Sequence, residues 1–103
     1  MPYADPLSSQ EIEARLSALP GWTVSDDGTT LRRTYRLPHL PAAIFALHIA
    51  GIQADLNHHS DLTLGYDTLA VALTTHAAGR RLTQKDFDLA TRITSIASGH
   101  GAR

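Results

Sequence analysis

The spacing of apolar residues predicts a first helix over residues 8–19. Ser8 and Glu11 have the S-x-x-E spacing of a capping box, in which each side chain accepts a hydrogen bond from the other residue's backbone N–H. Leu7 precedes this box, at the position of a hydrophobic staple. The apolar face of the helix is formed by Ile12, Leu16 and Leu19. The pair Pro20-Gly21 is typical of a helix end.

Two β-prone runs follow within residues 22–37, WTVSDDGTTLRRTYRL. They flank Asp26-Asp27-Gly28, a turn signal whose glycine tolerates a positive φ. The segment therefore predicts a β-hairpin. Arg33 interrupts the apolar alternation of its second strand, which consists of Leu31, Tyr35 and Leu37.

Residues 38–57 predict a second helix, with Pro41 suited to its first position. One apolar stripe is formed by Phe45, Ile49, Ile52 and Leu56. Ile44 and Leu47 widen this stripe beyond what one core-facing side needs. We therefore expect the helix to be buried on more than one side, with a partner subunit as the second cover.

A second hairpin is predicted over residues 61–76, where apolar residues again alternate on both sides of a short connection at Asp67-Thr68. A third helix follows, beginning at a capping box formed by Thr83 and Asp86. Leu82 and Phe87 could form its hydrophobic staple. Its buried face is expected to consist of Phe87, Ala90, Ile93 and Ala97, with the helix ending at Gly99.

The order helix, hairpin, helix, hairpin, helix lacks the alternating pattern of a parallel sheet. It predicts an α+β fold in which a four-stranded antiparallel sheet carries three helices on one face. The length of 103 residues favours a single domain over residues 1–103. We expect its ends, residues 1–6 and 99–103, to be flexible.

Composition narrows the functional classes. With 43% hydrophobic and 18% charged residues and a net charge of −1, the chain shows no electrostatic footprint for nucleic acid or acidic lipid. It has no cysteine, so disulfides and thiolate chemistry are excluded. No apolar run approaches a membrane span of about 20 residues, and no secretory signal is recognisable. A cytoplasmic location is the resulting expectation.

Three histidines stand at the ends of predicted elements: His58, His59 and His76. His59 and His76 lie eight residues before and after the Asp67-Thr68 connection, so the hairpin should bring them together. Imidazoles titrate near neutral pH, and a cluster of them indicates proton transfer or metal binding. Adjacent histidines seldom aim at one ion, and no carboxylate has an obvious ligand spacing. Ordinary hydrogen-bonded boundary residues are the remaining alternative.

The stretch NHHSDLTLGYDTLAVALTTHAAGRRLTQKDFDLA resembles the pterin-4a-carbinolamine dehydratase (4a-hydroxytetrahydrobiopterin dehydratase) family. The matching features are His58-His59, an aromatic residue (Tyr66) in the next strand, the TTH sequence ending at His76, and LT-x-x-D ending at Asp86. LPGW at residues 19–22 is also similar to the family. The resemblance implies an α+β fold, assembly as a homodimer or homotetramer, and activity without a metal or organic cofactor.

The implied reaction is loss of water from a 4a-hydroxytetrahydropterin to give quinonoid dihydropterin, in tetrahydrobiopterin recycling. It needs an acid for the leaving hydroxyl and a base for the N5 proton, which suits imidazoles. Our hypothesis is that His58 and His76 carry the proton transfers and that His59 orients the pterin. Asp86 and Tyr66 complete the expected substrate-binding residues, together with His58 and His59.

Three departures from the family pattern bear on activity. Ala54 stands where the family often has an acidic residue, Ser60 stands where it often has proline, and the loop containing Arg80-Arg81 is one residue longer. They leave an alternative of a different class, a non-catalytic dimeric interaction or assembly module of the same fold.

Overall fold

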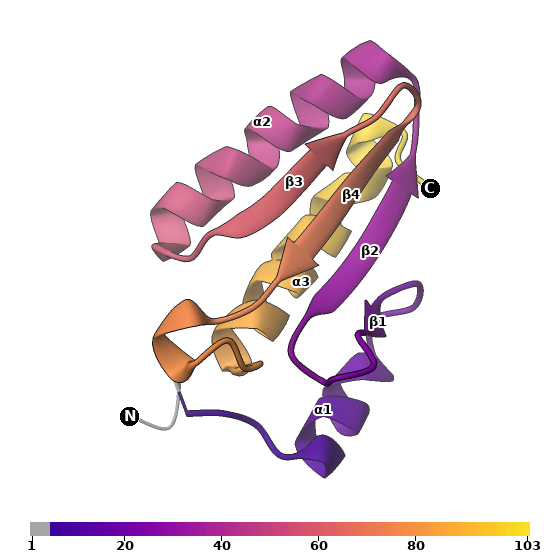
Figure 1. Cartoon of the computed structure of the whole chain (residues 1–103). Helices are drawn as coiled ribbons and strands as arrows, with labels where there is room; N and C mark the ends of the chain where they lie inside the picture. The colour runs from indigo at the N-terminus through magenta and orange to yellow at the C-terminus, as the bar shows by residue number, and fades with distance from the viewer. Residues whose placement is uncertain (1–4) are drawn as a thin grey trace.

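The computed structural model describes residues 5–103, so the expected flexibility of residues 1–6 falls largely outside the described residues. In chain order the elements are α1 (Ser9–Leu16), β1 (Thr23–Val24), β2 (Leu31–Arg36), α2 (His39–Leu56), β3 (Ser60–Leu64), β4 (Thr68–Leu73), the 3-10 turn η2 (His76–Ala78), α3 (Gln84–Ala97) and the 3-10 turn η3 (Ser98–His100) (Figure 1).

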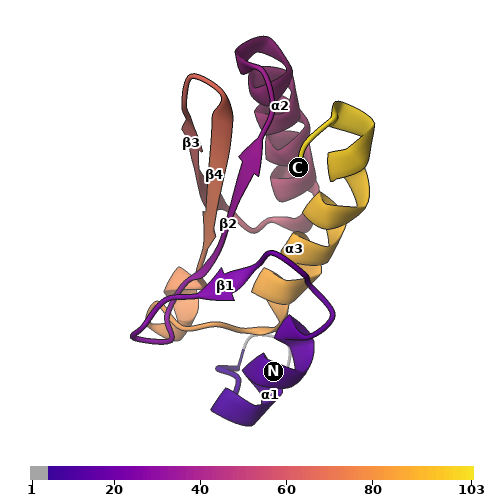
Figure 2. The ribbon, with the colours of Figure 1, turned by 90° about the vertical axis from the view of Figure 1, so that its right-hand side faces the viewer.

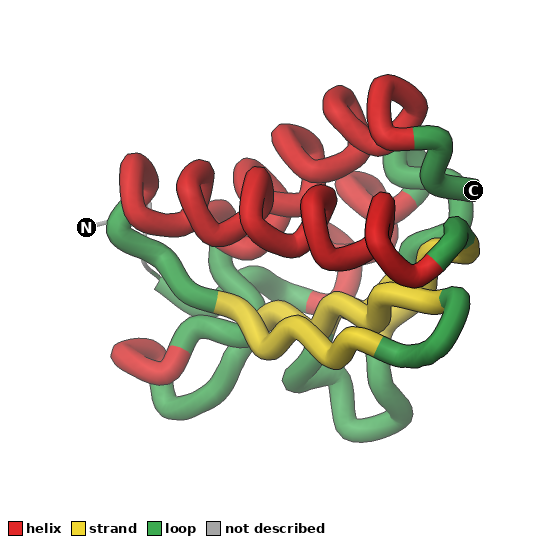
Figure 3. The backbone as a smooth tube through the Cα atoms, turned by 90° about the horizontal axis from the view of Figure 1, so that it is seen from above, coloured by secondary structure: helices red, strands yellow, loops and turns green. Residues whose placement is uncertain are grey.

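The strands form one antiparallel sheet in the order β1-β2-β4-β3. Helices α2 and α3 lie on the same side of it and leave the other face open (Figure 2). Viewed from above, the helices make one layer and the strands a second (Figure 3). The predicted α+β fold is confirmed. Helix α1 lies beyond the end of the sheet, where Arg15 Nε donates to Gln84 Oε1 at the start of α3 (2.6 Å).

The inward side chains of the strands and the facing sides of α2 and α3 form one core. Its completely buried members include Leu31, Phe45, Ile49, Leu69, Leu73, Leu89 and Ile93. Arg33 breaks the alternation because its guanidinium lies over the Tyr35 ring, 4.4 Å from the centroid, and donates to the carbonyl oxygen of Pro20 (2.6 Å). Its charged end thus reaches the rim of the core, where a backbone oxygen accepts from it.

Both predicted capping boxes are present, at Ser8 with Glu11 and at Thr83 with Asp86. The position predicted for Pro41 is wrong, because α2 begins two residues earlier, at His39. Proline is accommodated at the third position as well, because the first four N–H groups of a helix have no partner within it.

The turn between β1 and β2 forms as expected around Gly28, whose φ is +74°. Hydrogen bonds from Thr29 and Ser25 lower the pKa of the Asp27 carboxyl to about 2. The carboxylate of Asp27 therefore stays ionised in the turn, where it holds the flanking polar side chains together.

The connection between β3 and β4 differs from the prediction. Tyr66 and Asp67 form the turn, and Gly65 N donates to Thr68 O across its base (2.9 Å). Ser60 pairs with Leu73, so the register differs by two residues from that expected, and its continuation sets His59 opposite Thr74 instead of His76. A shift of two leaves every side chain on its expected face, which is why apolar alternation could not reveal it.

Residues 99–103 were expected to be flexible, but the structure ties them to the sheet. Arg36 N donates to Arg103 O (2.9 Å), and Arg103 N donates to Arg36 O (3.1 Å). The side chain of Ala102 also packs against the core. Across residues 5–103, no helix combines the length and the apolar character needed to span a lipid bilayer.

We expect Leu69→Ala to lower the free energy of unfolding by about 2–5 kcal/mol, because it leaves a cavity in the core. Thr63→Ala, on the open face of the neighbouring strand, should change it by less than about 1 kcal/mol. Urea unfolding followed by the fluorescence of Trp22, the chain's one tryptophan, measures both. Equal losses would contradict the assignment of inner and outer faces.

Candidate active site

The adjacent histidines separate because the chain changes direction between α2 and β3. Asn57 takes a left-handed conformation (φ 51°) at the end of α2, and His58 N donates to Gln53 O (3.0 Å). His58 and His59 lead directly into β3, which begins at Ser60, and neighbouring side chains along such a chain point to opposite faces. His58 consequently points toward the helices and is 8% exposed, whereas His59 is exposed.

The imidazole of His58 belongs to a buried hydrogen-bond network centred on Asp86. Asp86 is 0% exposed, and its Oδ1 lies 2.7 Å from His58 Nε2. Its Oδ2 accepts from the Thr75 hydroxyl (2.7 Å) and from the backbone N–H of Thr83 (2.9 Å). The Thr75 and Thr83 hydroxyl oxygens are 2.8 Å apart. Both carboxylate oxygens are thus engaged, and the orientation of the His58 ring is fixed.

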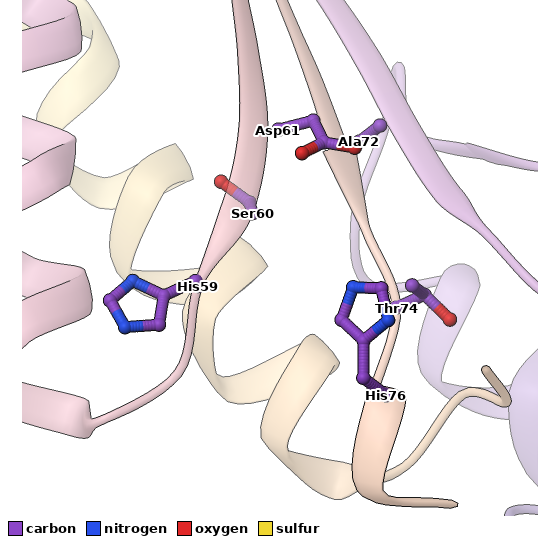
Figure 4. Close-up of a pocket in the computed structure, with 6 residues that line it drawn as sticks. All are labelled: His59, Ser60, Asp61, Ala72, Thr74 and His76. Carbon is purple, nitrogen blue, oxygen red and sulfur yellow. The ribbon is translucent and has the colours of Figure 1, made fainter. Parts of the chain in front are cut away.

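A cavity of about 300 Å³ opens beside this network, at the lower end of the size range of small-molecule sites. It is lined by Asn57, His58, His59, Thr74, Thr75, His76, Ala77 and Lys85. A smaller pocket of about 50 Å³ continues along the open face of the sheet and shares His59, Thr74 and His76 with it (Figure 4). Together they make a trough across the ends of β3 and β4.

The turn that carries the two histidines is fixed by a second side-chain contact. The Ser60 hydroxyl donates to Gln53 Oε1, and Gln53 is buried in the last turns of α2. Ser60 therefore ties the first residue of β3 back to the helix. This contact limits the conformational freedom of the chain at a position where the family often has proline.

Of the residues predicted for the site, the structure brings His58, His59 and His76 to one cavity. Asp86 lies behind His58 and does not line the cavity. Tyr66 is in the turn at the opposite end of the β3–β4 hairpin and is 89% exposed. The sequence did not predict that Thr75 and Lys85 line the cavity. The TTH sequence and the capping box drew attention to these two segments, but they do not indicate which side chains line a cavity.

The remaining histidines lie elsewhere. His48 and His100 are hydrogen-bonded to each other (Nδ1 to Nε2, 2.8 Å), and His39 Nδ1 contacts the carbonyl oxygen of Gly65 (2.8 Å). Within residues 5–103 no group of three or more histidine, aspartate or glutamate side chains is arranged to hold a metal ion.

The fold and this trough define a two-layer α+β domain with a histidine-lined cavity. The family described as pterin 4 alpha carbinolamine dehydratase matches residues 5–96, so the chain belongs to that family. A Streptomyces coelicolor protein, provisionally named a pterin-4-alpha-carbinolamine dehydratase, is 53% identical over 96% of this chain and 97% of its own. A Streptomyces avermitilis protein with the same provisional name is 50% identical over 95% and 96%.

Solved structures show the same relationship. A crystal structure from Brucella melitensis, described as a transcriptional coactivator/pterin dehydratase, superposes with a TM-score of 0.84. It is 27% identical to this chain and covers 89% of it and 98% of the Brucella chain.

Adjacent threonines test the buried network. Thr75→Val should lower the free energy of unfolding by about 1–3 kcal/mol, because Asp86 loses a donor. Thr74→Val is the matched control, since the Thr74 hydroxyl is buried without a hydrogen-bond partner among the described residues. Its replacement should be neutral or stabilising. Urea unfolding of both variants measures the difference, and equal effects would contradict the network.

Proposed function

We propose that this protein dehydrates a 4a-hydroxytetrahydropterin to quinonoid dihydropterin and water, by histidine acid–base catalysis without a metal or organic cofactor. One observation carries the proposal: the three imidazoles of the family pattern line one cavity of about 300 Å³. Family membership supports the class of reaction. The proposed setting is tetrahydrobiopterin recycling after aromatic amino acid hydroxylation. A cytoplasmic location remains a prediction from the sequence.

The reaction requires the protein to carry out two proton transfers. The N5 lone pair of the substrate forms the C4a=N5 double bond while the C4a–O bond breaks. An imidazolium gives its proton to the departing hydroxyl, which leaves as water, and an imidazole takes the proton from N5. Groups placed for such transfers contribute about 10²–10⁴-fold to the rate.

The geometry supports different roles for the adjacent histidines. Asp86 engages Nε2 of His58, so a proton that His58 exchanges with a ligand passes through Nδ1. We assign the proton transfers to His58 and His76 and the orientation of the pterin to His59. Asp86 becomes a positioning residue instead of a direct substrate contact, because it is completely buried. Tyr66 could reach this cavity only from another copy of the chain, given its place at the far end of the hairpin.

The longer loop is compatible with activity. Gly79 and Arg80 have positive φ values of 73° and 63°, and they return the chain so that Thr75 N donates to Arg81 O (3.0 Å). The additional residue is therefore absorbed within the loop, and Thr75 still contacts Asp86. Ala54 supplies no carboxylate, and we assign the proton transfers to the imidazoles.

The experiment measures dehydration of 4a-hydroxytetrahydropterin generated during the assay. His58→Ala and His76→Ala should each lower kcat/KM by about 10²–10⁴-fold. His59→Ala should act mainly by raising KM. His39→Ala, at the far end of α2, is the control and should behave as the unmodified protein does. Unchanged rates in the first two variants, or no acceleration by the unmodified protein, would refute the proposal.

A second candidate function, a dimeric interaction or assembly module, is favoured by the uncovered side of α2. Leu40, Ile44 and Leu47 are 69%, 51% and 74% exposed. With the exposed Gly51 and Ala54 they have the 4-3-4-3 spacing of a helix-pairing seam. Two antiparallel copies crossing at Leu47 would set the large side chains of one against the small residues of the other. This complementarity supports a homodimer or homotetramer, and the Brucella protein's description as a coactivator also fits such a module.

We expect light scattering to give a mass of two or four chains. Leu47→Glu should shift this mass toward one chain, because it places charges at the centre of the seam. Ser95→Glu, on an exposed part of α3, is the control and should leave the mass unchanged. A single-chain mass for the unmodified protein would contradict assembly through α2.

A further inference from the structure

Asp61 is the one carboxylate among the residues that line the trough. The proposed reaction gives it no role. Asp61 lies on β3, two residues after His59, which immediately precedes the strand, and both side chains are exposed on its open face. It lines the pocket that also contains His59 and His76 (Figure 4). Asp61 is exposed and forms no hydrogen bond or ion pair with any residue from 5 to 103.

The neighbours of Asp61 leave room for a flat ligand. Its cross-strand partner is Ala72, whose methyl group forms a low floor between β2 and β3. On the far side of Ala72 lies Arg32, which interacts with the Asp27 carboxylate instead. Thr74 also lines this pocket, but its hydroxyl oxygen is buried and points away from Asp61 (Figure 4). The trough therefore offers a ligand one carboxyl group, that of Asp61, with unused hydrogen-bonding capacity.

A pterin ring presents a matching pair of donors. Its 2-amino group and the adjacent N3–H lie side by side on the pyrimidine edge, spaced to meet the two oxygens of one carboxylate. Such charge-assisted bidentate contacts are among the stronger and more specific hydrogen bonds in proteins. Residues two apart on a strand are about 6.5–7 Å apart, close to the length of a bicyclic ring.

We propose that Asp61 determines specificity by accepting hydrogen bonds from the 2-amino group and N3–H of the pterin. This inference rests on the proposed function, because it assigns the substrate of the same site. It also orients the substrate: the pyrimidine edge lies over Ala72 at Asp61, and C4a with its hydroxyl lies toward the cavity that His58 and His76 line.

The first experiment compares the kinetics of Asp61→Asn with those of the unmodified protein in the dehydratase assay. KM should rise by about 10-fold or more, since a charged hydrogen-bond acceptor is lost. The value of kcat should change by less than about 3-fold, because the contact is the same in ground state and transition state. Asp26→Asn, which removes an exposed carboxylate from the β1–β2 turn, is the matched control and should change neither value.

The second experiment measures equilibrium binding of pterin and of lumazine, which has oxygen in place of the 2-amino group. The unmodified protein should bind pterin at least about 10-fold more tightly, and Asp61→Asn should reduce that ratio to within about 2-fold. A preserved ratio, or an unchanged KM, overturns the inference. If Asp61 serves only to prevent aggregation through the edge strand β3, the variant should keep both the binding ratio and the KM and should aggregate more.

The two experiments separate this inference from the proposed function. If the unmodified protein does not accelerate dehydration but loses its preference for pterin on Asp61→Asn, the reaction is wrong and the role of Asp61 stands. If it accelerates dehydration and the variant matches it in KM and preference, the role of Asp61 is wrong and the reaction stands. Absence of both acceleration and pterin binding overturns both.

Discussion

The carboxylate of Asp86 has no contact with solvent, and an unpaired charge there would be strongly destabilising. It is accommodated because His58, Thr75 and the N–H of Thr83 all donate to it or share a proton with it. His58 lies just before β3, Thr75 just after β4, and Thr83 is the N-cap of α3. One buried carboxyl group therefore joins three parts of the fold at the place where the cavity opens.

Much of the fold follows from interactions between residues close in sequence. The capping boxes at Ser8 and Thr83, the inward alternation of the strands and the Gly28 turn all depend on neighbours within a few positions, so the sequence reveals them. The gathering of His58, His59 and His76 was predictable for a related reason. Any hairpin between them brings its two ends together, whatever its precise register.

The remainder depends on contacts between distant segments. The register of β3 against β4 is decided at a turn with several acceptable centres, and a shift of two keeps the same faces buried. Arg103 pairs with Arg36 through backbone atoms alone, which no side-chain pattern indicates. Asp86 could be recognised as a helix cap, but its contact with His58 spans 28 positions and needs the complete fold.

Two segments border the cavity, and they differ in how well they tolerate a change in chain length. The first is the α2–β3 junction, where the left-handed residue Asn57 ends the helix. The second is the loop from His76 to Leu82. One residue inserted or removed between Leu56 and Ser60 would exchange the faces of His58 and His59, sending the wrong ring toward Asp86. An additional residue between His76 and Leu82 lies in a loop that starts and finishes outside the strands, and here it leaves Thr75 and Thr83 in contact. Insertions and deletions should therefore be tolerated in the loop that contains η2. The number of residues at the α2–β3 junction should stay constant.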